Sequence, residues 1–175
     1  MNHSIVVMAS VLLLSGCSQG EWEIKTKKSE MTDEVVHTLG RHSTEKFVLP
    51  KTALRSEEES FRPWFAIRVL PGRGYYYELF TGGGLDHRGE WGEVAVRLDD
   101  EPAVRFPARE VNGKTWVYRV RASDGFLRNM LDAKKMLRIE YTTLFEGTRV
   151  VHFPLEGFRP KLEALCDQFK RECAL

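Results

Sequence analysis

Short runs of alternating apolar and polar residues, separated by turn residues, fill most of the chain. Two aromatic and β-branched runs, 64–70 and 75–80, flank Pro71-Gly72, which is the pattern of an antiparallel hairpin. Asn112-Gly113, the strongest two-residue hairpin signal, precedes another run at 115–120. Further runs lie at 22–27, 34–39, 46–49, 94–98, 103–106, 136–141 and 148–153. Because this alternation indicates half-buried strands, the sequence predicts a mainly β domain, an antiparallel β-sandwich of roughly seven to nine strands.

Two segments have the period of a helix instead. The first, residues 124–133, is preceded by Ser123 or Asp124 as its N-cap, and the second covers residues 160–170. Their apolar faces consist of Phe126, Leu127, Met130 and Leu131 in the first segment and Leu162, Leu165, Cys166 and Phe169 in the second. We therefore expect two short helices beside the strands.

The amino-terminal segment is continuously apolar from Ile5 to Leu14 and ends in Ser15-Gly16-Cys17. A membrane-spanning helix needs about 20 apolar residues, and this run is roughly half that length, so a cleaved signal peptide is predicted. The sequence Leu-Ser-Gly-Cys resembles a bacterial lipobox, which implies a diacylglycerol thioether on Cys17 and an acylated amino group. Two or three acyl chains, at about 0.8 kcal/mol per buried CH2 group, anchor a protein stably to a membrane.

The residues after the cysteine refine the expected location. Ser18 and Gln19 follow Cys17 where an Asp would stand in lipoproteins kept at the inner membrane, so the resemblance implies an outer-membrane lipoprotein that faces the periplasm. The expected organisation is therefore a signal peptide at residues 1–16, a lipidated tether at 17–21, a single domain at 22–170 and a tail at 171–175. The 159 residues left after removal of the first 16 are enough for one such domain.

The balance of charge excludes nucleic acid as a predicted partner. The 26 basic and 25 acidic side chains are spread along the chain and give a formal net charge of +1, so no nucleic-acid-binding surface is predicted.

The sequence leaves open whether Cys166 and Cys173 form a disulfide. Their Cα atoms would lie about 10 Å apart on one continuous helix, beyond the limit of about 7 Å for a disulfide. A bridge between them thus requires the helix to end between them. Otherwise Cys166 packs as a small apolar residue.

No catalytic or metal-binding pattern is found in the sequence. The mature histidines His37, His42, His87 and His152 have no metal-ligand spacing with one another or with cysteines and carboxylates. The acidic runs at 57–59 and 99–101 lack the ligand spacing of a calcium loop and are expected to be solvated turns. We therefore predict a protein without enzymatic activity, metal or cofactor.

Two segments are candidates for contacts with a partner. Residues 82–92 are glycine-rich but lack the Gly-Lys-Ser/Thr ending of a phosphate-binding loop, so they form either a structural connection or a contact loop. Three successive tyrosines precede this segment, and alternation places the first and third on one face of a strand and the second on the other. The candidate partner-binding residues are Tyr75, Tyr76, Tyr77, Asp86, His87, Arg88 and Trp91.

Spaced segments between Trp22 and Cys166 resemble the type VI secretion-associated VasI/TagO-like family. They are residues 22–24, 31–33, 64–69, 116–120, 126–141, 153–158 and 162–166. The resemblance implies a small exported β-rich domain without a known catalytic centre, associated with a contractile secretion apparatus. In that family a further cysteine near the start of the domain often pairs with the C-terminal one. Here only Cys17 precedes Cys166.

Two hypotheses of function follow. The first is a non-enzymatic accessory or interaction module of the cell envelope, held at the membrane by its acyl chains and bound to an envelope protein. The second is a lipoprotein that captures a small ligand, a glycan or an enzyme in a groove near His87 and Arg88. The second hypothesis predicts a concave pocket with convergent polar groups.

Overall fold

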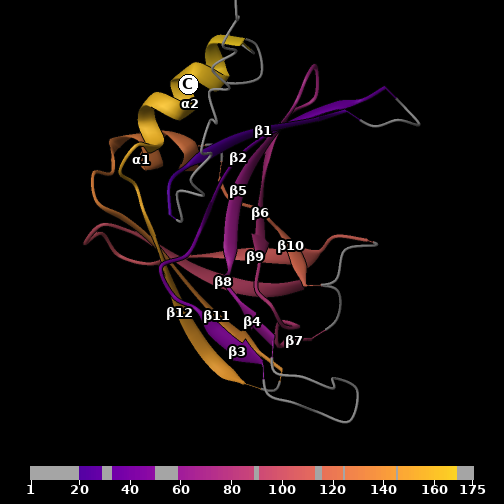
Figure 1. Ribbon diagram of the computed structural model, residues 1–175. Coiled ribbons are helices and arrows are strands. Elements are labelled where there is room, and N and C mark those ends of the chain that lie inside the picture. Colours follow the sequence, from indigo (N-terminus) through magenta and orange to yellow (C-terminus); the bar gives the residue numbers. More distant parts are fainter. Residues whose placement is uncertain are drawn as a thin grey trace, which may run out of the picture.

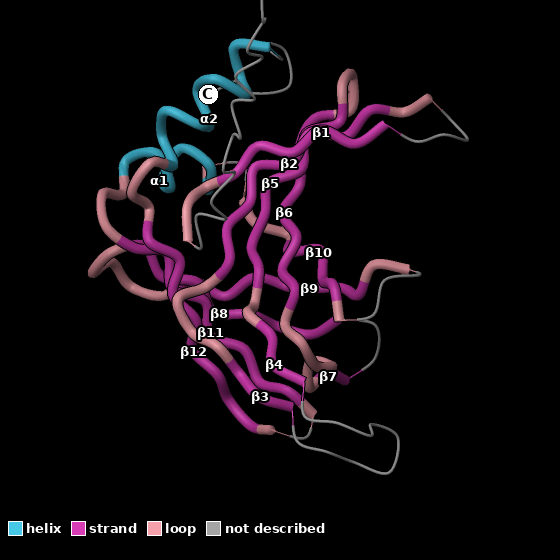
Figure 2. Tube along the Cα trace, viewed as in Figure 1, coloured by secondary structure: helices cyan, strands magenta, loops and turns pink. Residues whose placement is uncertain are grey.

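The computed structural model describes residues 20–28, 33–49, 59–88, 91–112, 116–123, 125–144 and 146–168. It shows a mainly β protein with one large antiparallel sheet, a two-stranded ribbon and two helices (Figures 1 and 2). The strands are β1 (Glu23–Lys28), β2 (Val35–His42), β3 (Phe47–Leu49), β4 (Glu59–Phe61), β5 (Trp64–Leu70), β6 (Gly74–Phe80), β7 (His87–Arg88), β8 (Trp91–Leu98), β9 (Val104–Glu110), β10 (Val117–Val120), β11 (Met136–Thr143) and β12 (Gly147–Pro154). The helices are α1 (Phe126–Asp132) and α2 (Phe158–Gln168).

The large sheet has the strand order β1-β2-β5-β6-β10-β9-β8-β11-β12, with β7 paired to β8. It is strongly curved, so the last strand returns to the segment that follows β2 (Figure 1). At this junction the Thr44 N–H donates to the carbonyl of His152 over 2.9 Å. The predicted β content and helices are confirmed, but a sandwich is not, because the strands of the large sheet form one continuous hydrogen-bonded path.

The core lies on the inner face of this curved sheet. Phe65 is its centre, stacked on Tyr77 with ring centroids 6.0 Å apart and in contact with Phe153 at 5.8 Å. Trp22 contacts both Phe65 and Phe158 and donates a hydrogen bond from its indole to the carbonyl of Pro154. Aromatic rings from both chain ends therefore meet in one core, which fixes α2 against the sheet.

The two helices cover one end of the sheet (Figure 2). The described residues of both predicted apolar faces are buried, including Phe126 and Met130 in α1 and Leu162 and Leu165 in α2, and Phe169 lies outside the described residues. The predicted N-cap of α1 is wrong: Gly125 is at that position, without a side-chain cap, and the Phe126 N–H donates to the carbonyl of Ser123. Within the described ranges, neither helix has the length and apolar composition needed to cross a bilayer.

Cys166 lies near the end of α2, is buried and is disulfide-bonded. The alternative in which it is an unbonded apolar residue is therefore wrong. Gln168 is the last residue of α2 that the structure describes, so a bridge between Cys166 and Cys173 stays a prediction. Cys173 lies outside the described residues, as do the predicted signal peptide and Cys17.

The glycine run after β6 is a site of close backbone packing. Gly82 has a φ of +69°, and a Cβ placed there would lie 1.8 Å from the ring of Phe61. The Gly84 carbonyl accepts a hydrogen bond from the Leu144 N–H, and the Leu85 N–H donates to the hydroxyl of Tyr118. These contacts match the structural interpretation of this segment.

Candidate functional site

The three tyrosines of β6 are divided between the two faces of the sheet. Tyr77 is 4% exposed and stacks on Phe65, and Tyr75 packs edge-on against Tyr77 at 5.8 Å. Tyr76 is on the outer face, where the Arg119 guanidinium lies 4.1 Å from the centre of its ring. Alternation therefore makes Tyr76 the member of this run whose side chain is available at the outer surface.

A groove of about 660 Å³ lies beside Tyr76 over strands β6, β10, β9 and β8. It is lined by Gly74, Tyr75, Tyr76, Tyr77, Trp91, Arg109, Glu110, Val111, Asn112, Arg119, Val120, Arg121, Ala122 and Ser123. Its volume is within the range of about 300–1,000 Å³ that is typical of small-molecule sites. Residues of four adjacent strands, together with the segments that follow β9 and β10, thus line one hollow.

Aromatic and arginine side chains form a row across this groove. The Arg109 guanidinium lies 5.9 Å from the centre of the Trp91 ring, at one end of the row, and Arg119 stacks over Tyr76 at the other. Between them Arg109 and Arg119 are direct cross-strand partners in the pairing of β9 with β10. We call the four residues Tyr76, Arg119, Arg109 and Trp91 the aromatic–arginine row.

The carboxylates next to the row already have partners. Glu78, the cross-strand partner of Arg119 in β6, is 0% exposed and makes an ion pair with Arg68. Glu110 accepts a hydrogen bond from the backbone N–H of Trp116 over 3.2 Å. Arg109, Arg119 and Arg121 line the groove together with Glu110, so its described lining carries more positive than negative side chains.

The phenol of Tyr76 is neutral at physiological pH. Its burial and the nearby Glu78 carboxylate raise the pKa of Tyr76, and the guanidinium groups of Arg68 and Arg119 offset this only in part. A neutral phenol can both donate and accept a hydrogen bond, so Tyr76 offers polar as well as aromatic contact in the groove.

The structure brings together only some of the predicted contact residues. Tyr76 and Trp91 line the groove, whereas Asp86 lies away from it, with its backbone N–H bonded to the carbonyl of Thr142. His87 and Arg88 form β7, which pairs with the start of β8, but their side chains lie outside the described residues. Arg109 and Arg119 were not predicted as contact residues, because the only signal for them in the sequence is an arginine at an outward position of each of two strands.

Comparisons with known proteins identify no relative. Models of protein families, curated proteins and solved structures were all compared with the chain, and none matches it.

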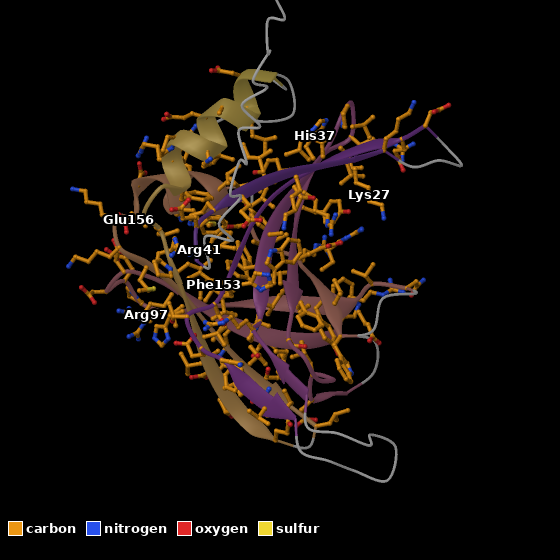
Figure 3. All side chains as sticks on the ribbon, in the orientation of Figure 1. Lys27, His37, Arg41, Arg97, Phe153 and Glu156 are labelled. Carbon is orange, nitrogen blue, oxygen red and sulfur yellow. The ribbon has the colours of Figure 1, made fainter. Side chains whose placement is uncertain are left out.

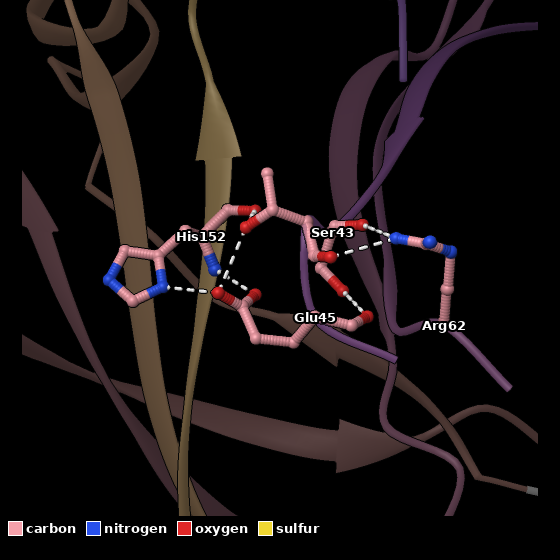
Figure 4. Close-up of polar contacts among 5 residues, drawn as sticks. Ser43, Glu45, Arg62 and His152 are labelled. Carbon is pink, nitrogen blue, oxygen red and sulfur yellow. Dashed lines mark hydrogen bonds and ion pairs between the residues drawn. The ribbon is translucent and has the colours of Figure 1, made fainter. Parts of the chain in front are cut away.

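A second polar cluster joins the segment after β2 to β12 (Figure 4). The Glu45 carboxylate accepts a hydrogen bond from the backbone N–H of His152 at 2.8 Å and lies 2.6 Å from its ring Nδ1. Ser43 is buried and donates to the carbonyl of Glu45, while Arg62 donates to the carbonyls of Ser43 and Thr44. In Figure 4 the second ring nitrogen of His152 points away from Ser43. Ser43 and His152 are therefore not arranged as a nucleophile and its general base.

This cluster stabilises the closure of the sheet, as does a neighbouring arginine. Arg41 donates from Nη1 to the carbonyls of Pro154 and Glu156, just beyond the buried Phe153 (Figure 3). Among the described residues, no group of three or more histidine, cysteine or acidic side chains is placed to hold a metal ion. The aromatic–arginine row is therefore the candidate binding site, and the Glu45–His152 contact is a structural link.

The hydrogen bonds of the Glu45 carboxylate make the free energy of unfolding depend on pH. Burial alone would raise the pKa of Glu45, but hydrogen bonds from His152 and Thr44 outweigh it and hold the pKa below the ordinary value of 4.5. Since the unfolded chain takes up the proton first, Glu45 stabilises the fold above that value, and the contribution is lost as the pH falls through the lower folded-state pKa. We expect the urea midpoint of Glu45→Gln to fall less steeply below pH 4.5 than that of the wild type. Parallel pH profiles would contradict this assignment.

Proposed function

We propose that this chain is a bacterial lipoprotein, anchored to the outer membrane by acyl chains on Cys17, that acts by binding rather than by catalysis in the periplasm. The observation that carries the binding role is the aromatic–arginine row, which gathers two aromatic rings and two guanidinium groups in one exposed groove. Aromatic and arginine side chains are the residues most enriched at binding surfaces.

The disulfide at Cys166 supports the proposed compartment. Disulfides persist in oxidising environments such as the bacterial periplasm and are rare in the cytosol. If Cys17 carries a thioether, it has no thiol left to pair. With three cysteines in the chain, an intramolecular partner of Cys166 would then be Cys173.

Two partners fit a binding module at this location. The first, drawn from the resemblance to the VasI/TagO-like family, is an envelope protein such as a component of a contractile secretion apparatus, which the chain would contact as an accessory module. The second candidate partner is a small ligand or glycan, which is favoured because the groove is concave and lined by arginines. Both candidates use the same surface, so one experiment in cells tests the binding role.

Photo-crosslinking within cells tests that role. A photoreactive p-benzoylphenylalanine replaces Trp91 in the groove or, as a matched control, Arg97, which is an exposed residue on the same strand outside the groove (Figure 3). We expect an ultraviolet-dependent adduct in the membrane fraction for position 91 and none for position 97, with the adduct mass revealing the bound molecule. An identical pattern at the two positions, or no adduct at either, would overturn the proposal that the groove is the working surface.

A further inference from the structure

We infer that a cleft between α1 and the turn that joins β8 to β9 binds a small organic cation with an apolar body, such as an arylammonium or alkylammonium ion. The cleft has a volume of about 590 Å³, which is within the range of about 300–1,000 Å³ typical of small-molecule sites. It goes beyond the proposed function, because it is separate from the groove beside Tyr76. Of the described lining residues, the two hollows share only Ser123.

The floor of the cleft is apolar and partly open to solvent. Phe106 of β9 and Phe126 of α1 meet there with ring centroids 5.3 Å apart, and both rings are buried. Val104 lies two residues before Phe106, so alternation places it on the same face of β9. It is nevertheless 53% exposed, whereas Phe106 is 8% exposed. Apolar surface is therefore left uncovered at this end of the strand, where the apolar body of a ligand can bury it.

The walls of the cleft carry negative charge. Its described lining includes the carboxylates of Asp99, Glu101 and Asp132 and no basic side chain. Glu101 belongs to the turn after β8 and Asp132 is the last residue of α1, so each wall contributes a carboxylate. Both side chains are exposed, and neither forms an ion pair with a described residue. A bound cation would therefore be attracted by two carboxylates without displacing a base.

Two nearby arginines have other partners. Arg159 donates to the carbonyl of Leu131 and lies 3.7 Å from the carboxylate of Glu163. Arg138 donates to the carbonyl of Asp99. Neither guanidinium group lines the cleft, so neither neutralises its two exposed carboxylates.

Asp99 holds the two walls in place. Its backbone is left-handed, with φ +46°, and its carboxylate accepts hydrogen bonds of 2.8–2.9 Å from the backbone N–H groups of Lys134, Lys135 and Met136. These three residues follow α1, so the turn after β8 is tied to the segment just beyond Asp132. The exposed carboxylates are thus positioned before a ligand arrives, which lowers the entropic cost of binding.

This combination favours an organic ammonium ion over other ligands. An anion would be repelled by Glu101 and Asp132, whereas a cation is attracted. A metal ion requires several close ligands, and the described residues contain no group of three or more acidic, histidine or cysteine side chains placed to hold one. The floor at Val104 adds affinity only for a cation that carries hydrocarbon.

Isothermal titration calorimetry on the full chain, purified in a nonionic detergent, tests the inference, with a titration into detergent alone as the blank. Three probes share one apolar body and differ in charge: 4-phenylbutylamine, which is a cation at neutral pH, the neutral 4-phenylbutanol and the anionic 4-phenylbutyrate. We expect saturable binding of the amine, at least about tenfold weaker binding of the alcohol, and weaker binding still of the carboxylate.

Variants of the cleft test its residues one by one. Glu101→Gln and Asp132→Asn should each weaken binding of the amine about three- to fivefold, because each removes one exposed charge. Val104→Ser should weaken binding of both the amine and the alcohol about threefold. The matched control, Asp167→Asn, removes an exposed carboxylate of α2 outside the cleft and should leave affinity unchanged.

All four variants should keep the thermal midpoint of the wild type, because the altered side chains are exposed. A second measurement needs no variant: at about 1 M sodium chloride the preference for the amine over the alcohol should shrink, since salt screens the exposed carboxylates. This keeps the charge argument testable if a substitution lowers the midpoint.

Three results would overturn the inference. These are absence of saturable binding of the amine, equal affinity for the amine and the alcohol, and affinity for the amine that is the same in the wild type and in both acidic variants. The photo-crosslinking experiment at position 91 probes the other hollow, so failure here leaves the proposed function standing. Failure of the crosslinking in turn leaves this cleft to be judged by the titrations alone.

Discussion

Replacing Cys17 with serine is expected to move the protein almost entirely from the membrane fraction to the soluble fraction. In the proposed lipoprotein two or three acyl chains on this residue supply the membrane affinity, at about 0.8 kcal/mol per buried CH2 group. The described part of the chain contains no helix able to span a bilayer and replace that anchor. The measurement is immunoblotting of membrane and soluble fractions after a high-salt wash.

A second variant removes the effect of an uncleaved leader. In it, residues 1–17 are replaced by the cleavable signal peptide of a soluble periplasmic protein, and we expect a soluble periplasmic product. The control, Ser18→Ala, keeps the cysteine and should remain with the membrane. Retention of the swapped variant in the membrane fraction would mean that the folded domain, and not Cys17, holds the protein there.

Substituting Gly82 with alanine is expected to lower the free energy of unfolding by about 2–5 kcal/mol. The left-handed backbone at φ +69° costs any other residue about 1–2 kcal/mol, and the new Cβ would lie 1.8 Å from Phe61. Displacing Phe61 would disturb its contacts with Phe47 and Phe80, which adds about 1–3 kcal/mol of overpacking.

Gly72 is the matched control for this substitution. Its φ is +75°, close to that of Gly82, but nothing lies within 4 Å of a Cβ placed there. Gly72→Ala should therefore show only the backbone cost of about 1–2 kcal/mol in urea unfolding. Equal destabilisation by the two substitutions would show that the Phe61 contact does not constrain the glycine run.

Local parts of the fold can be predicted from the sequence because their signals are local. The hairpin of β5 and β6 follows from two aromatic runs around Pro71-Gly72, and the structure pairs Trp64 with Phe80 and Leu70 with Gly74. The order of strands in the sheet is different. Strand β10 pairs with β6 although β7, β8 and β9 lie between them in the sequence, and no local pattern specifies that pairing.

The residues of the candidate site also divide into those that the local sequence indicates and those that it does not. Tyr76 could be nominated because it belongs to the run of three tyrosines, and Trp91 because it lies in the glycine-rich segment. Arg109 and Arg119 could not, since a single arginine in an apolar strand has the ordinary pattern of a solvated face. Only the pairing of β9 with β10 places the two guanidinium groups opposite each other and next to both aromatic rings.

The predicted sandwich is not confirmed, and the reason is again that local sequence does not specify which distant strands meet. Alternating strands predict that one face of a sheet is buried, but they do not say whether that face packs on a second sheet or on the same sheet curved around it. Here the link between Glu45 and His152 brings the end of the sheet back to the segment after β2. That contact spans most of the chain and has no counterpart in local sequence.

Mass spectrometry of the protein extracted from membranes, digested without reduction, tests the anchored binding module most directly. The account predicts an amino-terminal peptide that begins at Cys17 and carries the thioether-linked diacylglycerol and an amide-linked acyl chain, together with a peptide pair joined through Cys166 and Cys173. A bridge between Cys17 and Cys166, or an unprocessed amino terminus that begins at Met1, would contradict it.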